Sequence, residues 1–191
     1  ADTVDGISLG SEDTAALFRG DYFYVAGTGS APYVSVFRID KTAKTLELTG
    51  QSAETGSSKG IAAAGNYLFS QGSPTAGEYY FHVWNMDSKK QPELVSSVEL
   101  PAYAHDLRLY GDHVYLSLDA EGLMVLDISN PEDPRIISVY SVGSSVSGID
   151  LQGGYAYLGL RDNGLAVFDI SVPEVPVFKT SLSGGSTYRI K

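Results

Sequence analysis

Cysteine is absent from the 191 residues of this sequence. The chain therefore forms no disulfide framework, and a thiolate metal site or a cysteine nucleophile is excluded. No apolar run approaches the ~18 residues of a membrane-spanning helix, so direct membrane insertion is not expected. The first ten residues also lack the basic and apolar regions of a signal peptide. We therefore expect the sequence to begin either at the start of a processed, mature form or inside a longer chain.

Basic residues are also few, with 13 Lys and Arg against 23 Asp and Glu and a net charge of −10. A chain this acidic repels the phosphates of nucleic acid and an anionic membrane surface, so neither is expected to be its main partner. Methionine occurs only twice, and no stretch repeats apolar residues at helical spacing for more than a turn or two. Alternating apolar and polar residues, with 21 glycines and 13 tyrosines, favour an all-β protein.

Two landmarks mark four internal repeats. The first is GDYFYVAG at Gly20, GNYLFSQG at Gly65, GDHVYLSL at Gly111 and GGYAYLGL at Gly153, at intervals of 45, 46 and 42 residues. The second is VFRID at Val36, VWNMD at Val83, VLDIS at Val125 and VFDIS at Val167. Repeats of this length, made of four short strands, are typical of β-propeller blades, each of which buries the face of the next. The sequence therefore predicts a β-propeller of four-stranded antiparallel blades.

The repeats divide the whole chain. We expect the outer strand of a partial blade at residues 1–10, four complete blades at 11–55, 56–101, 102–143 and 144–185, and the first strand of a further blade at 186–191. These pieces belong to one propeller domain. Three interpretations stay open: a fragment of a longer propeller, a self-contained four-bladed propeller, or an open array completed by another subunit, because unpaired edges are templates for pairing.

The first strands of the blades show a shared pattern. Apolar residues stand four and two positions before each landmark glycine, and we expect them to pack between blades: Ala16 and Phe18, Ile61 and Ala63, Leu107 and Leu109, Ile149 and Leu151. Six positions before the glycine the residues are polar: Thr14, Lys59, His105 and Ser147. Because the first strand of a blade lies nearest the propeller axis, these polar residues are expected around one mouth of the central channel.

The best-matching stretches are GLMVLDISNPEDP at Gly122 and GLAVFDISVPEVP at Gly164, preceded by GDHVYLSLDAE and GGYAYLGLRDN. Together they resemble the LVIVD-repeat family of β-propellers, specifically over 104–181 and more weakly over 11–100, where Arg38 or Asn85 replaces the aspartate of the motif. The resemblance implies a bacterial or archaeal surface or secreted protein, extracellular or at the cell surface. It carries over no catalytic residue, because the motif is structural.

One group of residues is a candidate ligand-binding site at the channel mouth: Lys59, His105, Asp106 and Arg189. A histidine beside a carboxylate can perform acid–base chemistry or orient a ligand. Neither a nucleophile nor metal-ligand spacing accompanies it, so we expect no catalytic residue, metal or cofactor. Asp127 and Asp169 recur at one repeat position, and we expect their carboxylates to fix the proline loop that follows by accepting hydrogen bonds.

Three tyrosines, Tyr33, Tyr79 and Tyr80, fall in the expected loops between second and third strands, where an amphipathic ring favours protein contact. We therefore expect a non-enzymatic extracytoplasmic scaffold that mediates protein–protein contact or surface assembly, with a protein partner or self-association. Two alternatives remain: a hydrolase or lyase with an axial polar site, and a self-assembling subunit completed by strands from neighbouring copies.

Overall fold

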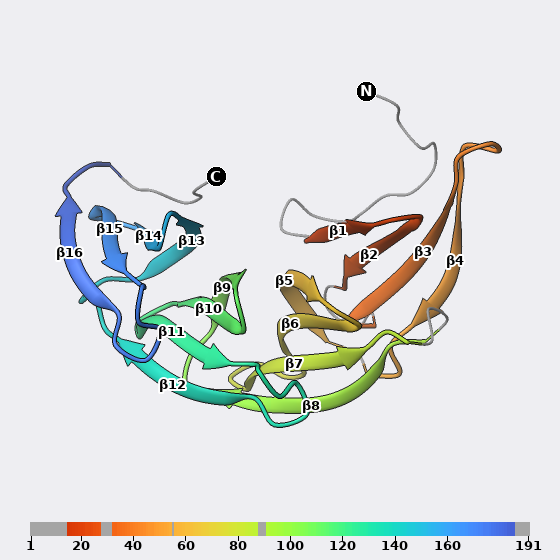
Figure 1. Ribbon diagram of the computed structural model, residues 1–191, viewed down its shortest axis with the longest axis horizontal. Coiled ribbons are helices and arrows are strands. Elements are labelled where there is room, and N and C mark those ends of the chain that lie inside the picture. The colour runs from red at the N-terminus through yellow and green to blue at the C-terminus, as the bar shows by residue number, and fades with distance from the viewer. Residues whose placement is uncertain (1–14, 28–31, 55, 88–90, 186–191) are drawn as a thin grey trace. The chain divides into compact units, whose positions relative to one another are not determined.

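The chain forms four separate antiparallel sheets of four strands each (Figure 1). They are seen in a computed structural model that describes residues 15–27, 32–54, 56–87 and 91–185. Each sheet is built from four consecutive strands, so every connection is a hairpin between neighbours. The predicted fold, an all-β chain of propeller blades, is confirmed. Within the described residues, no helix is long and apolar enough to cross a membrane.

The strands of the first two blades are β1 (Ala16–Arg19), β2 (Tyr22–Ala26), β3 (Val34–Asp40), β4 (Thr45–Gln51), β5 (Ser57–Ala64), β6 (Tyr67–Ser73), β7 (Tyr79–Asn85) and β8 (Glu93–Leu100). Those of the last two are β9 (Ala104–Tyr110), β10 (His113–Leu118), β11 (Gly122–Asp127), β12 (Arg135–Tyr140), β13 (Val146–Gln152), β14 (Tyr155–Leu160), β15 (Gly164–Asp169) and β16 (Val177–Leu182). The first landmark glycine of every repeat has a positive φ, between 54° and 61°, in the turn before the second strand.

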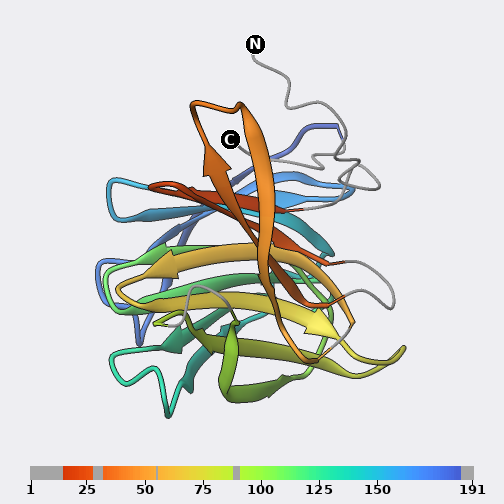
Figure 2. The ribbon, with the colours of Figure 1, turned by 90° about the vertical axis from the view of Figure 1, so that its right-hand side faces the viewer.

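The chain divides into two compact units, residues 1–97 and 98–191. Unit 1 contains the sheet of β1–β4 and most of the sheet of β5–β8, whereas unit 2 contains the sheets of β9–β12 and β13–β16. In unit 1 the hairpin of β3 and β4 runs past the ends of β1 and β2 (Figure 2). The partial blade expected at 1–10 and the strand expected at 186–191 lie outside the described residues.

The core of each unit lies between its two sheets. In unit 2, side chains of β10 and β11 pack against those of the last sheet; this cluster includes Tyr115, Leu123, Val125, Ile149, Leu158 and Phe168. In unit 1 the corresponding cluster includes Tyr24, Val34, Val36, Leu68, Trp84 and Met86. Burial of one such side chain stabilises the fold by roughly 1.5–3 kcal/mol. Neighbouring blades therefore stabilise each other, which explains why the sequence repeats.

The predicted packing of the first strands holds for the second and fourth blades but fails for the first. Ile61 and Ala63 pack against the core of unit 1, and Ile149 belongs to the core of unit 2. By contrast, Ala16 is exposed and Phe18 is 69% exposed. The reason is the alternation of a strand: Leu17 points to the second sheet of the unit, so its neighbours point to the opposite face, where no blade of that unit lies.

Candidate functional site

Three polar residues that stand six positions before a landmark glycine each lie at a β-bulge: Lys59, His105 and Ser147. Lys59 lies between Ser58 and Gly60, at the point where the strand register shifts. His105 is skipped in the pairing of β9 with β10, and Ser147 in the pairing of β13 with β14. A bulge leaves one residue outside the ladder and changes the direction of its side chain. The polar position is therefore a structural feature repeated in three blades.

His105 lies among charged side chains of unit 2. Its Nε2 atom is 3.6 Å from Asp119 Oδ1 and 3.4 Å from an Arg161 guanidinium nitrogen. A guanidinium can only donate hydrogen bonds, so the contact with Arg161 requires the lone pair of Nε2. That lone pair is the one a general base at this atom would use. While Arg161 makes this contact, the lone pair of Nε2 is not available to act as a catalytic base.

Asp106 does not pair with its neighbour His105, in contrast to the predicted His–Asp pair. Its carboxylate accepts hydrogen bonds from the backbone N–H of Leu107, at 2.9 Å, and from the guanidinium of Arg108. The same guanidinium lies 3.5 Å from Asp150 in the fourth blade. The carboxylate that lies near His105 belongs to Asp119, which stands thirteen residues after Asp106 in the sequence. No group of three or more His, Asp or Glu side chains in the described ranges could hold a metal ion.

The other two residues of the predicted site do not belong to the described part of unit 2. Lys59 lies on β5 in unit 1, whereas His105 lies on β9 in unit 2. Arg189 lies outside the described residues. The convergence of Lys59, His105 and Arg189 therefore stays a prediction.

Tyr33 is not a surface residue, and its predicted role in protein contact is wrong. It is 2% exposed and belongs to the core of unit 1. Gly56 and Gly72 make room for its ring, because a Cβ atom at either position would overlap the ring or its hydroxyl. Burial raises the pKa of Tyr33 to about 12.

Tyr79 and Tyr80 are the first residues of β7 and not part of a loop. Both side chains are partly buried, and the Tyr80 ring stacks on His82 at a centroid distance of 5.8 Å. The prediction that both residues lie in a loop is therefore wrong, because β7 already begins at Tyr79. Their role in protein contact stays a prediction.

His82 is a second histidine, buried in the core of unit 1, which the sequence did not single out. Its ring lies between Tyr33 and Trp84, at centroid distances of 4.8 and 5.6 Å. Its Nδ1 atom is 2.8 Å from the hydroxyl of Ser97. Burial lowers the pKa of His82 to about 4, so the ring is neutral at physiological pH. Enclosure by aromatic rings makes this histidine part of the core.

Asp127 and Asp169 have the structural role predicted for them. Asp127 accepts a hydrogen bond of 2.8 Å from the backbone N–H of Ser129. Asp169 accepts bonds from the N–H and the hydroxyl of Ser171, at 3.0 and 2.7 Å, and pairs with Lys179 Nζ at 3.0 Å. The Ser171 hydroxyl and N–H, with Lys179, lower the pKa of Asp169 to about 2. Both carboxylates thus hold the turn after the third strand.

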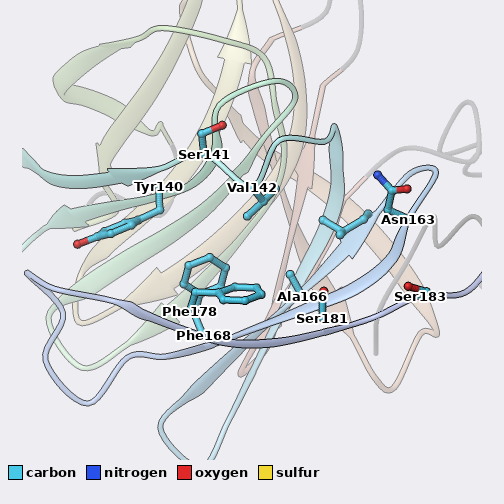
Figure 3. A pocket seen from close by; sticks show the side chains of 10 residues that line it. Tyr140, Ser141, Val142, Asn163, Ala166, Phe168, Phe178, Ser181 and Ser183 are labelled. Atoms are coloured by element: carbon cyan, nitrogen blue, oxygen red, sulfur yellow. The ribbon is translucent and has the colours of Figure 1, made fainter.

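An open groove lies between the two sheets of unit 2 (Figure 3). Its volume is about 500 Å³, and its walls are Tyr140, Ser141, Val142, Leu160, Asn163, Ala166, Phe168, Phe178, Ser181 and Ser183. The aromatic rings of Tyr140, Phe168 and Phe178 gather at one end, and Asn163 and Ser183 stand at the other. Phe178 meets Phe168 edge to face at 5.6 Å and is still 54% exposed.

The lining of the groove indicates which ligands it suits. Among the described residues that line it, the only ionisable side chain is that of Tyr140, and the other polar side chains are hydroxyls and one amide. A concave site with apolar walls and a few hydrogen-bonding groups is the usual form of a specific binding site. The groove therefore suits an uncharged ligand that combines an apolar group with hydrogen-bonding groups. No pattern in the sequence predicts this groove, because Phe178 alternates along its strand as a core residue would.

The two segments that form unit 2 also match a known family. Residues 101–142 and 143–183 each match the model of the LVIVD repeat. These two segments are LVIVD repeats. The LVIVD repeats thus contain both the His105 cluster and the groove. None of the curated proteins matches the chain.

Solved structures share the fold of most of the chain. The computationally designed Ika8 protein is similar over 92% of this chain and 51% of its own, with a TM-score of 0.71 and 13% identity. The designed Ika4 protein is similar over 76% of this chain and 86% of its own, with a TM-score of 0.60 and 12% identity. The chain thus spans about half the length of Ika8. At such low identity, these likenesses show the fold alone.

Proposed function

We propose that this LVIVD-repeat chain is a non-enzymatic scaffold that binds a protein partner, outside the cell or at the cell surface. The observation that carries the proposal is the groove of unit 2, where Phe178 offers an exposed aromatic ring beside a space of about 500 Å³. Exposed aromatic rings in a concave site are typical anchors of protein–protein interfaces. The extracytoplasmic location is supported by the resemblance to LVIVD-repeat surface proteins.

The chemistry of the groove favours a peptide segment with one large apolar side chain. That side chain would occupy the end formed by Tyr140, Phe168 and Phe178. The peptide backbone would then meet hydroxyl groups such as that of Ser181, which both donate and accept hydrogen bonds. An uncharged lining lets such a segment bind without the cost of burying an unpaired charge.

The hydrolase or lyase alternative has less support. It depends on a free base at His105, but Arg161 occupies the lone pair of Nε2 at 3.4 Å. It also depends on convergence with Lys59, which stays a prediction. A protein-contact function requires neither a free base at His105 nor convergence with Lys59.

Site-specific crosslinking tests the proposal. A photoreactive benzoylphenylalanine at Ser181, which lines the groove, is expected to crosslink a discrete protein from the extracellular fraction of the source organism. The matched control places the same group at Glu132, an exposed loop residue of unit 2 that does not line the groove. Phe178→Ser, added to the Ser181 probe, is expected to abolish the crosslink without lowering the melting temperature by more than a few degrees. Equal crosslinking from Glu132, or an unchanged product with Phe178→Ser, would refute the contact assignment.

A further inference from the structure

The outward face of the fourth blade repeats a surface that is buried inside unit 2. In the third blade, Tyr115, Leu123 and Val125 pack against the fourth blade and are 0% exposed. Forty-two residues later, the same residue types recur as Tyr157, Leu165 and Val167. These three side chains are only partly buried and are not part of the core of unit 2.

Strand pairing shows that these repeated residues share one face. Tyr157 pairs with Val167, whereas the core residues Ala156 and Phe168 pair with each other one position away. Because side chains alternate along a strand, Tyr157 and Val167 point away from the core. Leu182 pairs with Leu165 across β15 and β16 and is 60% exposed. The fourth blade thus has an apolar face of the kind that elsewhere in the chain packs on another blade.

The first blade has a complementary apolar face. Phe18 stacks on Phe23 at 4.4 Å, and Phe23 lies 6.4 Å from Phe37. Counted from the two repeat landmarks, these three positions correspond to Leu151, Ala156 and Phe168, the residues with which the fourth blade meets the third. Phe23 is buried and Phe37 partly buried, whereas Phe18, at the edge of the face, is 69% exposed. The chain therefore carries both halves of a blade-to-blade interface, and each half has an exposed apolar residue.

We propose that a second copy of this chain covers these faces, so that the fourth blade of one copy packs against the first blade of the next. This inference deepens the proposed scaffold function by naming a second copy as a partner, and it uses surfaces separate from the groove. A head-to-tail contact joins two different faces, so repeated contacts generate a ring or an open chain. The internal interface of unit 2, with its Tyr, Leu and Val residues at 0% exposure, is the template for the contact.

Sedimentation velocity of the chain and of two variants tests the proposal. The wild type is expected to form species of at least twice its 20.4 kDa. Phe18→Asp and Leu182→Asp should each weaken assembly at least tenfold, because a carboxylate would then be buried against an apolar face. Both side chains are more than half exposed, so the variants are expected to fold. Val172→Asp, at an apolar loop position that is 52% exposed, is the matched control and should assemble normally.

Sedimentation of a mixture of the two variants tests the proposal most directly. The Phe18→Asp chain keeps its fourth-blade face and the Leu182→Asp chain keeps its first-blade face, so an equimolar mixture should form a particle of two chains and no larger. A wild type that stays monomeric up to its solubility limit would overturn the proposal, as would a mixture that stays monomeric. If crosslinking at Ser181 persists in a monomeric wild type, the scaffold function stands and only self-association fails.

Discussion

His82 makes the stability of unit 1 depend on pH. It is 6% exposed, and burial lowers its pKa from 6.5 to about 4. Between these values the unfolded chain binds a proton that the folded chain does not, so stability is lost as the pH falls from about 6.5 to about 4. Across the whole window this difference amounts to on the order of 3 kcal/mol. Urea unfolding followed by Trp84 fluorescence at pH 7.0 and 4.5 is expected to show most of this loss.

The control for this prediction is a histidine in a different setting. His82→Gln removes the titration, so the loss of stability between pH 7.0 and 4.5 should shrink by a similar amount, even though the variant is less stable at pH 7.0. His113→Gln, at a partly exposed position of β10 in unit 2, is the matched control. If His82→Gln unfolds with the wild-type pH dependence, another group causes the acid sensitivity.

Tyr33 shows why the surroundings of a residue are hard to predict from a sequence. It follows a glycine-rich stretch and a proline, which indicate an exposed loop. Its burial depends on Gly56, just before β5, and Gly72, in β6, which leave space for the ring. These glycines are visible in the sequence, but their distance from Tyr33 is set by packing between blades. The alternation of apolar and polar residues within one strand gives no information about packing between blades.

Gly164, the residue that opens β15, is a point where two strands of one blade meet closely. Its φ is 86°, and a Cβ atom there would overlap the carbonyl oxygen of Leu182. Gly164→Ala therefore combines backbone strain with a displacement of the end of β16, and it should destabilise unit 2 by about 2–4 kcal/mol. The melting temperature measured by circular dichroism checks this value.

The matched substitution separates strain from overlap. Gly153→Ala also replaces a glycine of positive φ, 59°, but its Cβ atom would have open space. It should therefore cost only about 1 kcal/mol, the usual penalty for a left-handed residue other than glycine. Equal losses for the two variants would mean that the close approach to Leu182 contributes nothing.

At the scale of the strands, the sequence was a good guide where the repeat is regular. Strand β9, for example, ends at Tyr110, directly before the landmark Gly111. The polar positions Lys59, His105 and Ser147 were found by the same alignment, but their bulges were not predicted. A bulge changes the pairing of one residue while leaving the alternation of the flanking residues intact. The groove was missed because it depends on how far two outer strands separate.

For the whole molecule, repetition was enough to predict the fold but left the partner open. Four copies of one pattern require blades that stack, and the LVIVD repeats at 101–183 confirm the pattern where it is strongest. The exposed state of Phe18 could not be predicted, because a strand has the same alternation whether or not a blade covers it. The structure therefore adds which apolar faces are covered, and those faces determine how copies can associate.

The net charge of the chain gives a last test of the proposed assembly. Each copy carries a charge of −10, so two copies repel each other while their apolar faces attract. Raising the ionic strength shortens the Debye length from about 10 Å at 0.1 M to about 3 Å at 1 M, which screens the repulsion but not the burial of apolar surface. The dissociation constant measured by sedimentation should therefore fall severalfold over this range, whereas the Phe18→Asp variant should stay monomeric throughout. An assembly that dissociates as salt is added would instead indicate a contact held by ion pairs, and the apolar faces of the first and fourth blades would not be its interface.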